Sequence, residues 1–308
     1  MALTLPPLAP ARHGPHMDRV ETAPEIFDRP LLARRRARAA PRVHEVAPIL
    51  DAAAEILLDR LDDTTRRFAR ALDVGGRGAV APRLAARGIP LVVSMDLAAP
   101  MAARAGGLPL VADEEWLPFA PHSFDLIVAS LSLHMVNDLP GALVQLRRAL
   151  APDGLFLASL PGLGTLQPLR EALAAAESET RGGLSPRVSP FPELRDLAGL
   201  LQRAGFALPV ADQERLSLEW RSPMALVADL RAAGETNAIL ARDRRTPPRA
   251  LFPRAFAAMP LRQDAPLLVM TGWAPHESQQ KPARPGSATL RLSDALGTVE
   301  HKAGEPPG

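Results

Sequence analysis

Three glycines follow an acidic residue directly after a short apolar run. The run ends at Asp73, and the chain continues as Val74-Gly75-Gly76-Arg77-Gly78. Glycine lets a backbone turn tightly and approach a ligand closely, and the first N–H groups of a following helix can bind a negative or polar group. A carboxylate at the end of this strand would repel a pyrophosphate, so the loop favours a cofactor that carries positive charge. The alternative is an ordinary turn.

Two further acids stand at the ends of the next apolar runs. Asp96 closes the run 90–95, and Asp113 follows the run 108–112. Ligands of open α/β sheets bind at the carboxyl ends of the strands, so we expect Asp96 to accept both ribose hydroxyls and Asp113 to accept the adenine amino group. The three acids together predict S-adenosyl-L-methionine as the cofactor. The predicted cofactor-binding residues are Asp73, Gly75, Gly76, Gly78, Asp96, Leu97, Asp113, Glu114, Ser130 and Leu131.

His134 is the candidate catalytic residue, because it follows the apolar run 124–129 where a substrate would meet the cofactor. A neutral imidazole can accept a proton or a hydrogen bond there. The alternative is a structural histidine that packs against the next helix. Asn137 and Asp138 are expected to cap that helix, which begins at Leu139.

These residues lie in an alternation of short apolar runs and helical segments. That alternation predicts a parallel sheet with helices on both faces, and the continuously apolar runs are typical of strands buried on both sides. We therefore expect an α/β Rossmann-like fold with a seven-stranded, mostly parallel sheet. The expected strands are 68–74, 90–95, 108–112, 124–129, 155–160, 206–210 and 267–271, and the expected helices are 26–40, 43–61, 80–87, 139–150, 166–179, 194–204 and 224–233.

The 308 residues predict one large domain between two loose ends. Residues 1–22 are interpreted as a disordered leader and 275–308 as a disordered tail. The cofactor-binding domain is expected to span 23–274, with N-terminal helices and an insert near 215–260. Four arginines at positions 34, 35, 36 and 38 are interpreted as a solvated helix face, with attraction of an acidic partner as the alternative.

Composition excludes several classes of protein. The chain has no cysteine, which rules out disulfides, cysteine-ligated metals and a catalytic thiol, and which fits a cytoplasmic location. No histidines stand at metal-ligand spacing, so no metal site is predicted. A net charge of +2 gives no basis for nucleic-acid binding. No window contains the roughly 18 apolar residues of a membrane span.

Several segments resemble known families. ADEEWLPF (112–119), SFDLIVASLSLHMVNDLP (123–140) and LAPDG (150–154) are similar to class I S-adenosylmethionine-dependent methyltransferases. More narrowly, LSLHMVNDLP and RGGLSPRVSPF (181–191) resemble the family of mitochondrial NADH:ubiquinone oxidoreductase complex assembly factor 5 and its alphaproteobacterial relatives. That resemblance implies a protein substrate, a role in respiratory complex I assembly and, for the mitochondrial member, hydroxylation of an arginine in a complex I subunit.

The glycine loop departs from the class. Class I methyltransferases usually have D-x-G-x-G-x-G, whereas DVGGRGAV is one residue short and places Arg77 before the last glycine. Two alternatives therefore stay open beside an enzyme of complex I assembly. One is the malonyl-carrier-protein carboxyl methyltransferase of biotin synthesis, a sister resemblance. The other is a cofactor-binding assembly chaperone without catalysis.

Overall fold

The computed structural model describes residues 25–257, 259–280, 294 and 297. The predicted leader at 1–22 and most of the predicted tail lie outside these ranges. The chain divides into two units, 1–275 and 276–308, and the fold below belongs to the first. No helix within the described ranges is long and apolar enough to cross a membrane.

The described part of the first unit contains a seven-stranded sheet in the order β3-β2-β1-β4-β5-β7-β6. Strands β1 to β5 run parallel to one another, and β7 pairs antiparallel with both β5 and β6. The prediction of a Rossmann-like, mostly parallel sheet is confirmed. The strands are β1 (Arg70–Val74), β2 (Leu91–Asp96), β3 (Leu108–Val111), β4 (Phe124–Ser130), β5 (Leu150–Pro161), β6 (Ala207–Glu219) and β7 (Arg262–Trp273).

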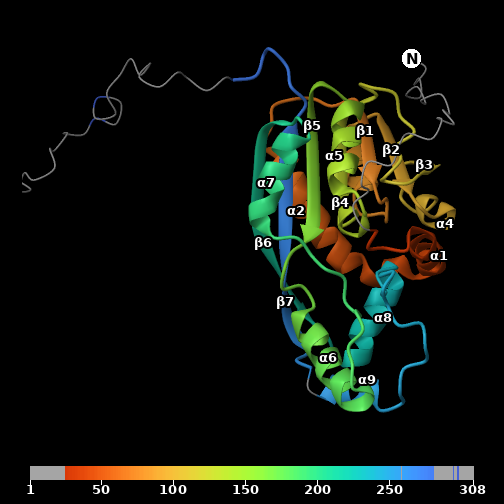
Figure 1. Ribbon diagram of the computed structural model, residues 1–308. Coiled ribbons are helices and arrows are strands. Elements are labelled where there is room, and N and C mark those ends of the chain that lie inside the picture. The colour runs from red at the N-terminus through yellow and green to blue at the C-terminus, as the bar shows by residue number, and fades with distance from the viewer. Residues whose placement is uncertain (1–24, 258, 281–293, 295–296, 298–308) are drawn as a thin grey trace, which may run out of the picture. The chain divides into compact units, whose positions relative to one another are not determined.

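Helices cover both faces of the sheet (Figure 1). Successive residues of a strand point to opposite faces, so Ala71 packs in the core beneath α2 while Leu72 packs in the core beneath α5 and α7. The α-helices are α1 (Arg29–Ala39), α2 (Ala47–Asp62), α3 (Ala81–Ala86), α4 (Ala99–Ala102), α5 (Leu139–Ala149), α6 (Gln167–Arg181), α7 (Leu194–Arg203), α8 (Pro223–Ala233) and α9 (Leu251–Ala257), with 3₁₀ helices η1 (Ala40–Val46) and η2 (Leu133–Met135).

A smaller third core lies beyond the carboxyl ends of the parallel strands. Because Pro161 at the end of β5 pairs with Leu267, residues 262–266 of β7 extend past that edge, together with the end of β6. Helices α6, α8 and α9 pack there (Figure 1) around Trp220 and neighbouring apolar side chains. The extension therefore forms one wall of a space above the sheet edge.

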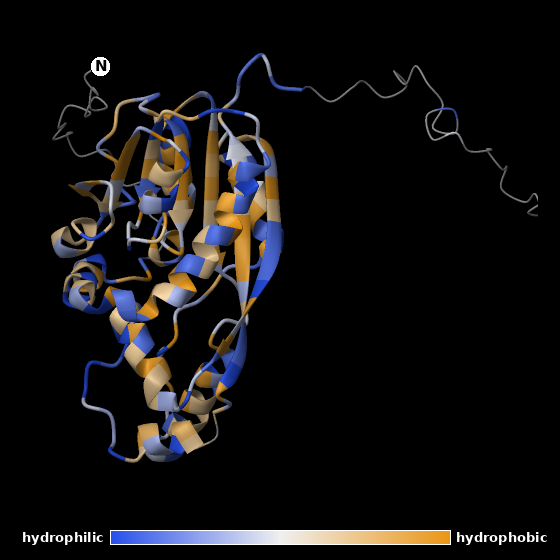
Figure 2. Cartoon of the chain, turned by 180° about the vertical axis from the view of Figure 1, so that it is seen from behind, coloured by the Kyte–Doolittle hydropathy of each residue, from blue (hydrophilic) through white to orange (hydrophobic). Residues whose placement is uncertain are grey.

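The two last strands are longer than predicted. The apolar runs 206–210 and 267–271 indicated only part of β6 and β7, which pair over most of their length. β6 is an edge strand in which half-buried and exposed residues alternate, and much of this edge is hydrophilic in Figure 2, in contrast to the central strands. Because β6 contains polar residues, apolar runs predict only part of its length. Residues 215–219 of the predicted insert belong to it.

The N-terminal segment is held by Asn137. The predicted helix from residue 26 begins instead at Arg29, with Asp28 as its N-cap. The backbone N–H groups of Ile26 and Phe27 donate to Asn137 Oδ1 at 2.8 and 2.7 Å, and Asn137 Nδ2 donates to the Phe27 carbonyl. Asn137 is thus not a helix cap, whereas Asp138 is: its Oδ1 accepts the N–H of Gly141 at 2.8 Å.

We expect Asn137→Ala to lower the free energy of unfolding by about 2 kcal/mol, because two backbone donors and an acceptor lose a partner. Hydrogen exchange of the Ile26 and Phe27 amides should quicken. Asp138→Ala is the matched control. It should lower the free energy of unfolding by about 1 kcal/mol and leave the exchange of the Ile26 and Phe27 amides unchanged. Urea unfolding and amide exchange measure both effects. Unaltered exchange at residues 26 and 27 in Asn137→Ala would contradict the anchoring role.

Candidate active site

Asp73 lies one residue before the end of β1, at the point where the strand order reverses, since β2 lies on one side of β1 and β4 on the other. This is where ligands of open α/β sheets bind. The carboxyl group is 2% exposed and accepts a hydrogen bond from Ser94 Oγ at 3.2 Å. Burial raises the pKa of Asp73 to about 7, against the opposing effects of Ser94 and Arg77. Near neutral pH this group is poised between charged and neutral forms.

Asp96 lies at the end of β2, fully buried, with both carboxylate oxygens engaged. Its Oδ1 accepts the Ala98 N–H at 2.8 Å, and its Oδ2 accepts Nη1 of Arg36 at 3.2 Å. Burial raises the pKa of Asp96, although the Arg36 guanidinium favours the charged form. The neighbouring Leu97 packs against the N-terminal cluster around Phe27.

Two arginines of α1 bind the acids that follow β3. Arg29 donates to both Asp113 and Glu114, and Arg36 donates to Glu114 Oε1 at 3.0 Å. Glu114 is fully buried; burial raises its pKa, but the guanidiniums of Arg36 and Arg29 hold that pKa below its usual value.

The interpretation of the arginine run as a solvated helix face is wrong at Arg36, which is 0% exposed. The sequence does not distinguish Arg36 from Arg34 and Arg38, which lie on the same helix and are exposed. Arg36 is buried because α1 packs beside α4, next to the ends of β2 and β3.

The glycines of the loop serve close packing within the protein. A Cβ added at Gly75 would overlap Ser132, and one at Gly76 would overlap Ala105. Gly75 and Gly78 have positive φ values of 81° and 91°, which glycine adopts without strain. The N–H groups of Gly75 and Gly76 donate to the Met95 carbonyl at 2.8 and 3.1 Å. The loop is therefore tied to β2 and to the segment after β4.

A buried triad joins this loop to the predicted catalytic residue. Nη1 of Arg77 donates to Glu235 Oε1 at 2.9 Å, and Glu235 Oε2 lies 2.9 Å from Nε2 of His134. Burial raises the pKa of Glu235, but His134 and Arg77 lower it more strongly and hold it at about 2. Glu235 was not among the predicted site residues, because it follows Gly234 at the end of α8 and no local sequence pattern marks it.

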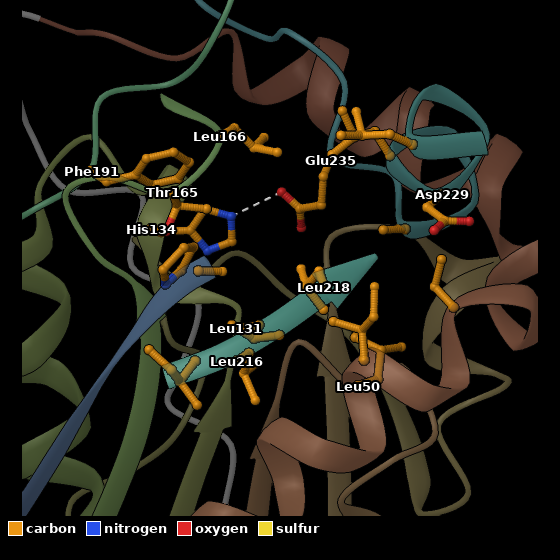
Figure 3. Close-up of a pocket in the computed structure, with 18 of the residues that line it drawn as sticks. Leu50, Leu131, His134, Thr165, Leu166, Phe191, Leu216, Leu218, Asp229 and Glu235 are labelled. Atoms are coloured by element: carbon orange, nitrogen blue, oxygen red, sulfur yellow. Dashed lines mark hydrogen bonds and ion pairs between the residues drawn. The ribbon is translucent and has the colours of Figure 1, made fainter. Parts of the chain in front are cut away.

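A pocket of about 150 Å³ opens beside the triad. Apolar side chains from α2, α8 and β6 line most of it, and the side chains of His134 and Glu235 meet there (Figure 3). Arg77 also belongs to the lining. Leu131, predicted as a cofactor residue, belongs to this lining, and its N–H donates to the Ser159 carbonyl at 3.0 Å. The pocket thus meets the sheet edge at the segment after β4.

Several polar atoms at this junction have no hydrogen-bond partner among the described residues. They are Ser130 Oγ, Ser132 Oγ, His134 Nδ1, Arg77 Nε, and Nε and Nη2 of Arg36. Buried polar groups are usually satisfied, so this cluster points to a ligand. Within the described ranges no three histidines, aspartates or glutamates are placed to hold a metal ion.

The donor set fits S-adenosylmethionine in kind. Acids end β1 and β2, a further pair follows β3, and unpartnered hydroxyls lie after β4. Asp96 Oδ2 accepts a hydrogen bond from Arg36, and because a carboxylate oxygen can accept a second hydrogen bond, a ribose hydroxyl could share this oxygen with Arg36. The residues therefore suit the cofactor.

Comparisons with known proteins agree with this fold. Residues 72–158 match the family model described as a methyltransferase domain. The human protein named arginine-hydroxylase NDUFAF5, mitochondrial, is 36% identical over 301 residues, covering 92% of this chain and 86% of that protein. The chain belongs to the NDUFAF5 family.

Two other similarities place that family within the class I methyltransferases. The malonyl-[acyl-carrier protein] O-methyltransferase of Gallionella capsiferriformans is 30% identical over 233 residues, covering 70% of this chain and 78% of that protein. A solved chain of the methyltransferase class from Bacillus halodurans covers 72% of this chain and 100% of its own length at 15% identity and a TM-score of 0.50, which shows the fold alone. The resemblances found in the sequence are confirmed, and the family implies the use of S-adenosylmethionine.

The buried Asp73 carboxyl should make stability depend on pH. Its pKa of about 7 in the folded chain lies above its unfolded value of 3.8. The folded state therefore binds the Asp73 proton more tightly than the unfolded state does. This adds up to about 4 kcal/mol to the free energy of unfolding below pH 4, and the added stability is lost as pH rises to 7. Asp73→Asn removes it. Urea unfolding from pH 4 to 8 should show a steeper decline for the wild type; equal slopes would contradict the assignment.

Arg36→Met should lower the free energy of unfolding by about 3 kcal/mol, because Asp96 and Glu114 would stay buried without their shared cation. Arg38→Met on the same helix is the matched control, since Arg38 is exposed, and it should change stability by less than about 0.5 kcal/mol. Denaturant unfolding at pH 7 compares the two. Equal effects of both substitutions would show that the buried pairs contribute nothing specific.

Proposed function

We propose that this chain binds S-adenosylmethionine at the carboxyl edge of its sheet and modifies a protein side chain that enters the adjoining pocket, in the assembly of respiratory complex I. The observation that carries the proposal is the junction of pocket and sheet edge at Leu131 and His134. A substrate group in the pocket would there meet a cofactor held by the strand-end acids. Family membership supports the same cofactor class.

In this proposal Asp96 accepts the ribose hydroxyls, with Asp73, Leu97, Asp113 and Glu114 around the rest of the cofactor. When bound, the cofactor's sulfonium supplies an activated methyl group. The chain contributes mainly alignment of the reacting groups, which by itself gives large rate effects.

His134 is proposed as the residue that accepts a proton from the acceptor group. The Glu235 carboxylate accepts a hydrogen bond from Nε2–H, which leaves the lone pair of a neutral ring on Nδ1. Nδ1 is buried and has no hydrogen-bond partner in the described structure. A base fixed in one tautomer, with its free nitrogen at the junction, suits proton transfer.

The proposed substrate is a protein with an accessible arginine. The human relative is named an arginine-hydroxylase, and we extend the substrate class, without the reaction, to this chain. The apolar pocket with an anionic group at its end suits a side chain that has a methylene stem and a cationic tip.

Calorimetric titration with S-adenosylmethionine tests the proposal. We expect binding to the wild type and at least tenfold weaker binding to Asp96→Ala, about 1.4 kcal/mol. Asp51→Ala is the matched control, because Asp51 also pairs with an arginine, at 2.8 Å from Arg83, outside the site. It should bind as the wild type does. Unchanged affinity in a folded Asp96→Ala would sink the ribose assignment.

A second candidate is a non-catalytic assembly chaperone. The Arg36 hydrogen bond to Asp96 and the close packing of Gly75 on Ser132 favour it, because both contacts occupy the sheet edge where a cofactor would bind. The same titration separates the candidates, since a chaperone that has lost the cofactor gives no binding heat at millimolar S-adenosylmethionine.

A further inference from the structure

The Arg77 guanidinium lies among three acceptors that belong to two different segments of the chain. Nη1 donates to the Glu235 carboxylate at 2.9 Å, and Nη2 donates to the carbonyl oxygens of Ser130, at 3.3 Å, and Leu131. We name these three acceptors the cation cradle. The Arg77 side chain is 3% exposed, so the cradle encloses a complete guanidinium group away from water.

The cradle lies between two hollows. Arg77 and Leu50 line the apolar pocket beside His134, and they also line a second hollow bounded by Val43, His44 and Arg104. Arg77 is therefore part of the wall between the two. Movement of its side chain toward the second hollow would leave the cradle open to the pocket, without a change in the sheet.

The electrostatics of the cradle require a cation. Glu235 is ionised at neutral pH, and a buried carboxylate without a positive partner is costly. Arg77 and His134 both lie against this carboxylate, while Arg77 Nε, Ser130 Oγ and Ser132 Oγ have no partner among the described residues. Burial lowers the pKa of Arg77, although Glu235 favours its charged form. A second cation-bearing group could use the same acceptors.

We propose that the cation cradle is a binding site for a guanidinium or ammonium group of a ligand, and that Arg77 occupies it until that group enters. The acceptor chemistry is the same for both groups, because each offers charged N–H donors. The two sources rest on the proposed function: the arginine side chain of the protein substrate, or the ammonium of S-adenosylmethionine. Arg77 thereby keeps Glu235 neutralised in the unliganded chain and competes with the ligand.

The test follows Arg77 itself in the full-length wild-type chain. Arginine-labelled protein gives an Nε–H resonance for Arg77, assigned by its loss in Arg77→Lys. Titration with N-acetyl-arginine amide should shift this resonance, whereas N-acetyl-citrulline amide, which is neutral, should not. S-adenosylhomocysteine, which carries the ammonium but no guanidinium, is titrated in parallel. A shift with only one of the two cationic ligands identifies the source of the cation.

Affinities of variants complete the test. Arg77→Ala should bind the effective ligand at least tenfold more tightly than the wild type, because the competitor is gone, and adding Glu235→Gln should remove that gain. Arg87→Ala is the matched control; Arg87 pairs with Asp62 at 2.7 Å on an exposed surface, and its loss should leave affinity unchanged.

Failure of the proposal is distinct from failure of the proposed function. If Arg77→Ala does not fold, the wild-type resonance alone decides. An Arg77 Nε–H signal that neither cationic ligand moves overturns the cradle proposal. If S-adenosylhomocysteine and N-acetyl-arginine amide both bind by calorimetry and neither shifts the Arg77 Nε–H resonance, the cradle proposal is wrong. The proposed cofactor site is unaffected by that result.

Discussion

The ion pairs between the arginines of α1 and the acids at the strand ends govern how this site is built. Arg36 is fully buried and shared by Asp96 and Glu114, and Arg29 holds Glu114 and Asp113. Removing charges from water is expensive unless each finds a partner, so α1 must lie where its arginines reach these acids. The helix is thereby fixed beside the sheet edge, with Arg36 against the Asp96 carboxylate.

The sheet supplies the fixed frame for these charges. Cores on both faces hold the parallel strands, so the acids after β1, β2 and β3 meet at one edge. The long β6 and β7 carry a third core beyond that edge and leave an apolar pocket between it and α2. The strands thus set the positions of the acids, while α1 and the glycine loop supply the buried Arg36 and Arg77.

Arg77 gives the short glycine loop a physical meaning. A buried guanidinium in the loop neutralises Glu235, and Glu235 in turn orients His134. The loop, the end of α8 and the segment after β4 are therefore connected by charge. The family has the methyltransferase fold and includes a protein named an arginine-hydroxylase. In this chain the acceptors of the proposed cation site are already occupied by the chain's own Arg77.

The sequence by itself determined the fold class and the edge of the sheet that carries the site. Both follow from local patterns: apolar runs of strand length, glycines after Asp73, and acids directly after the runs. Only the tertiary structure decided the partners of those residues. Arg36 and Asp96 are 60 residues apart in the chain, and Arg77 and Glu235 are 158 apart. Neither spacing leaves a periodic signal, because a buried ion pair depends on where the folded elements bring two side chains together. Asn137 had the sequence of a helix cap, yet it binds the N-terminal segment for the same reason.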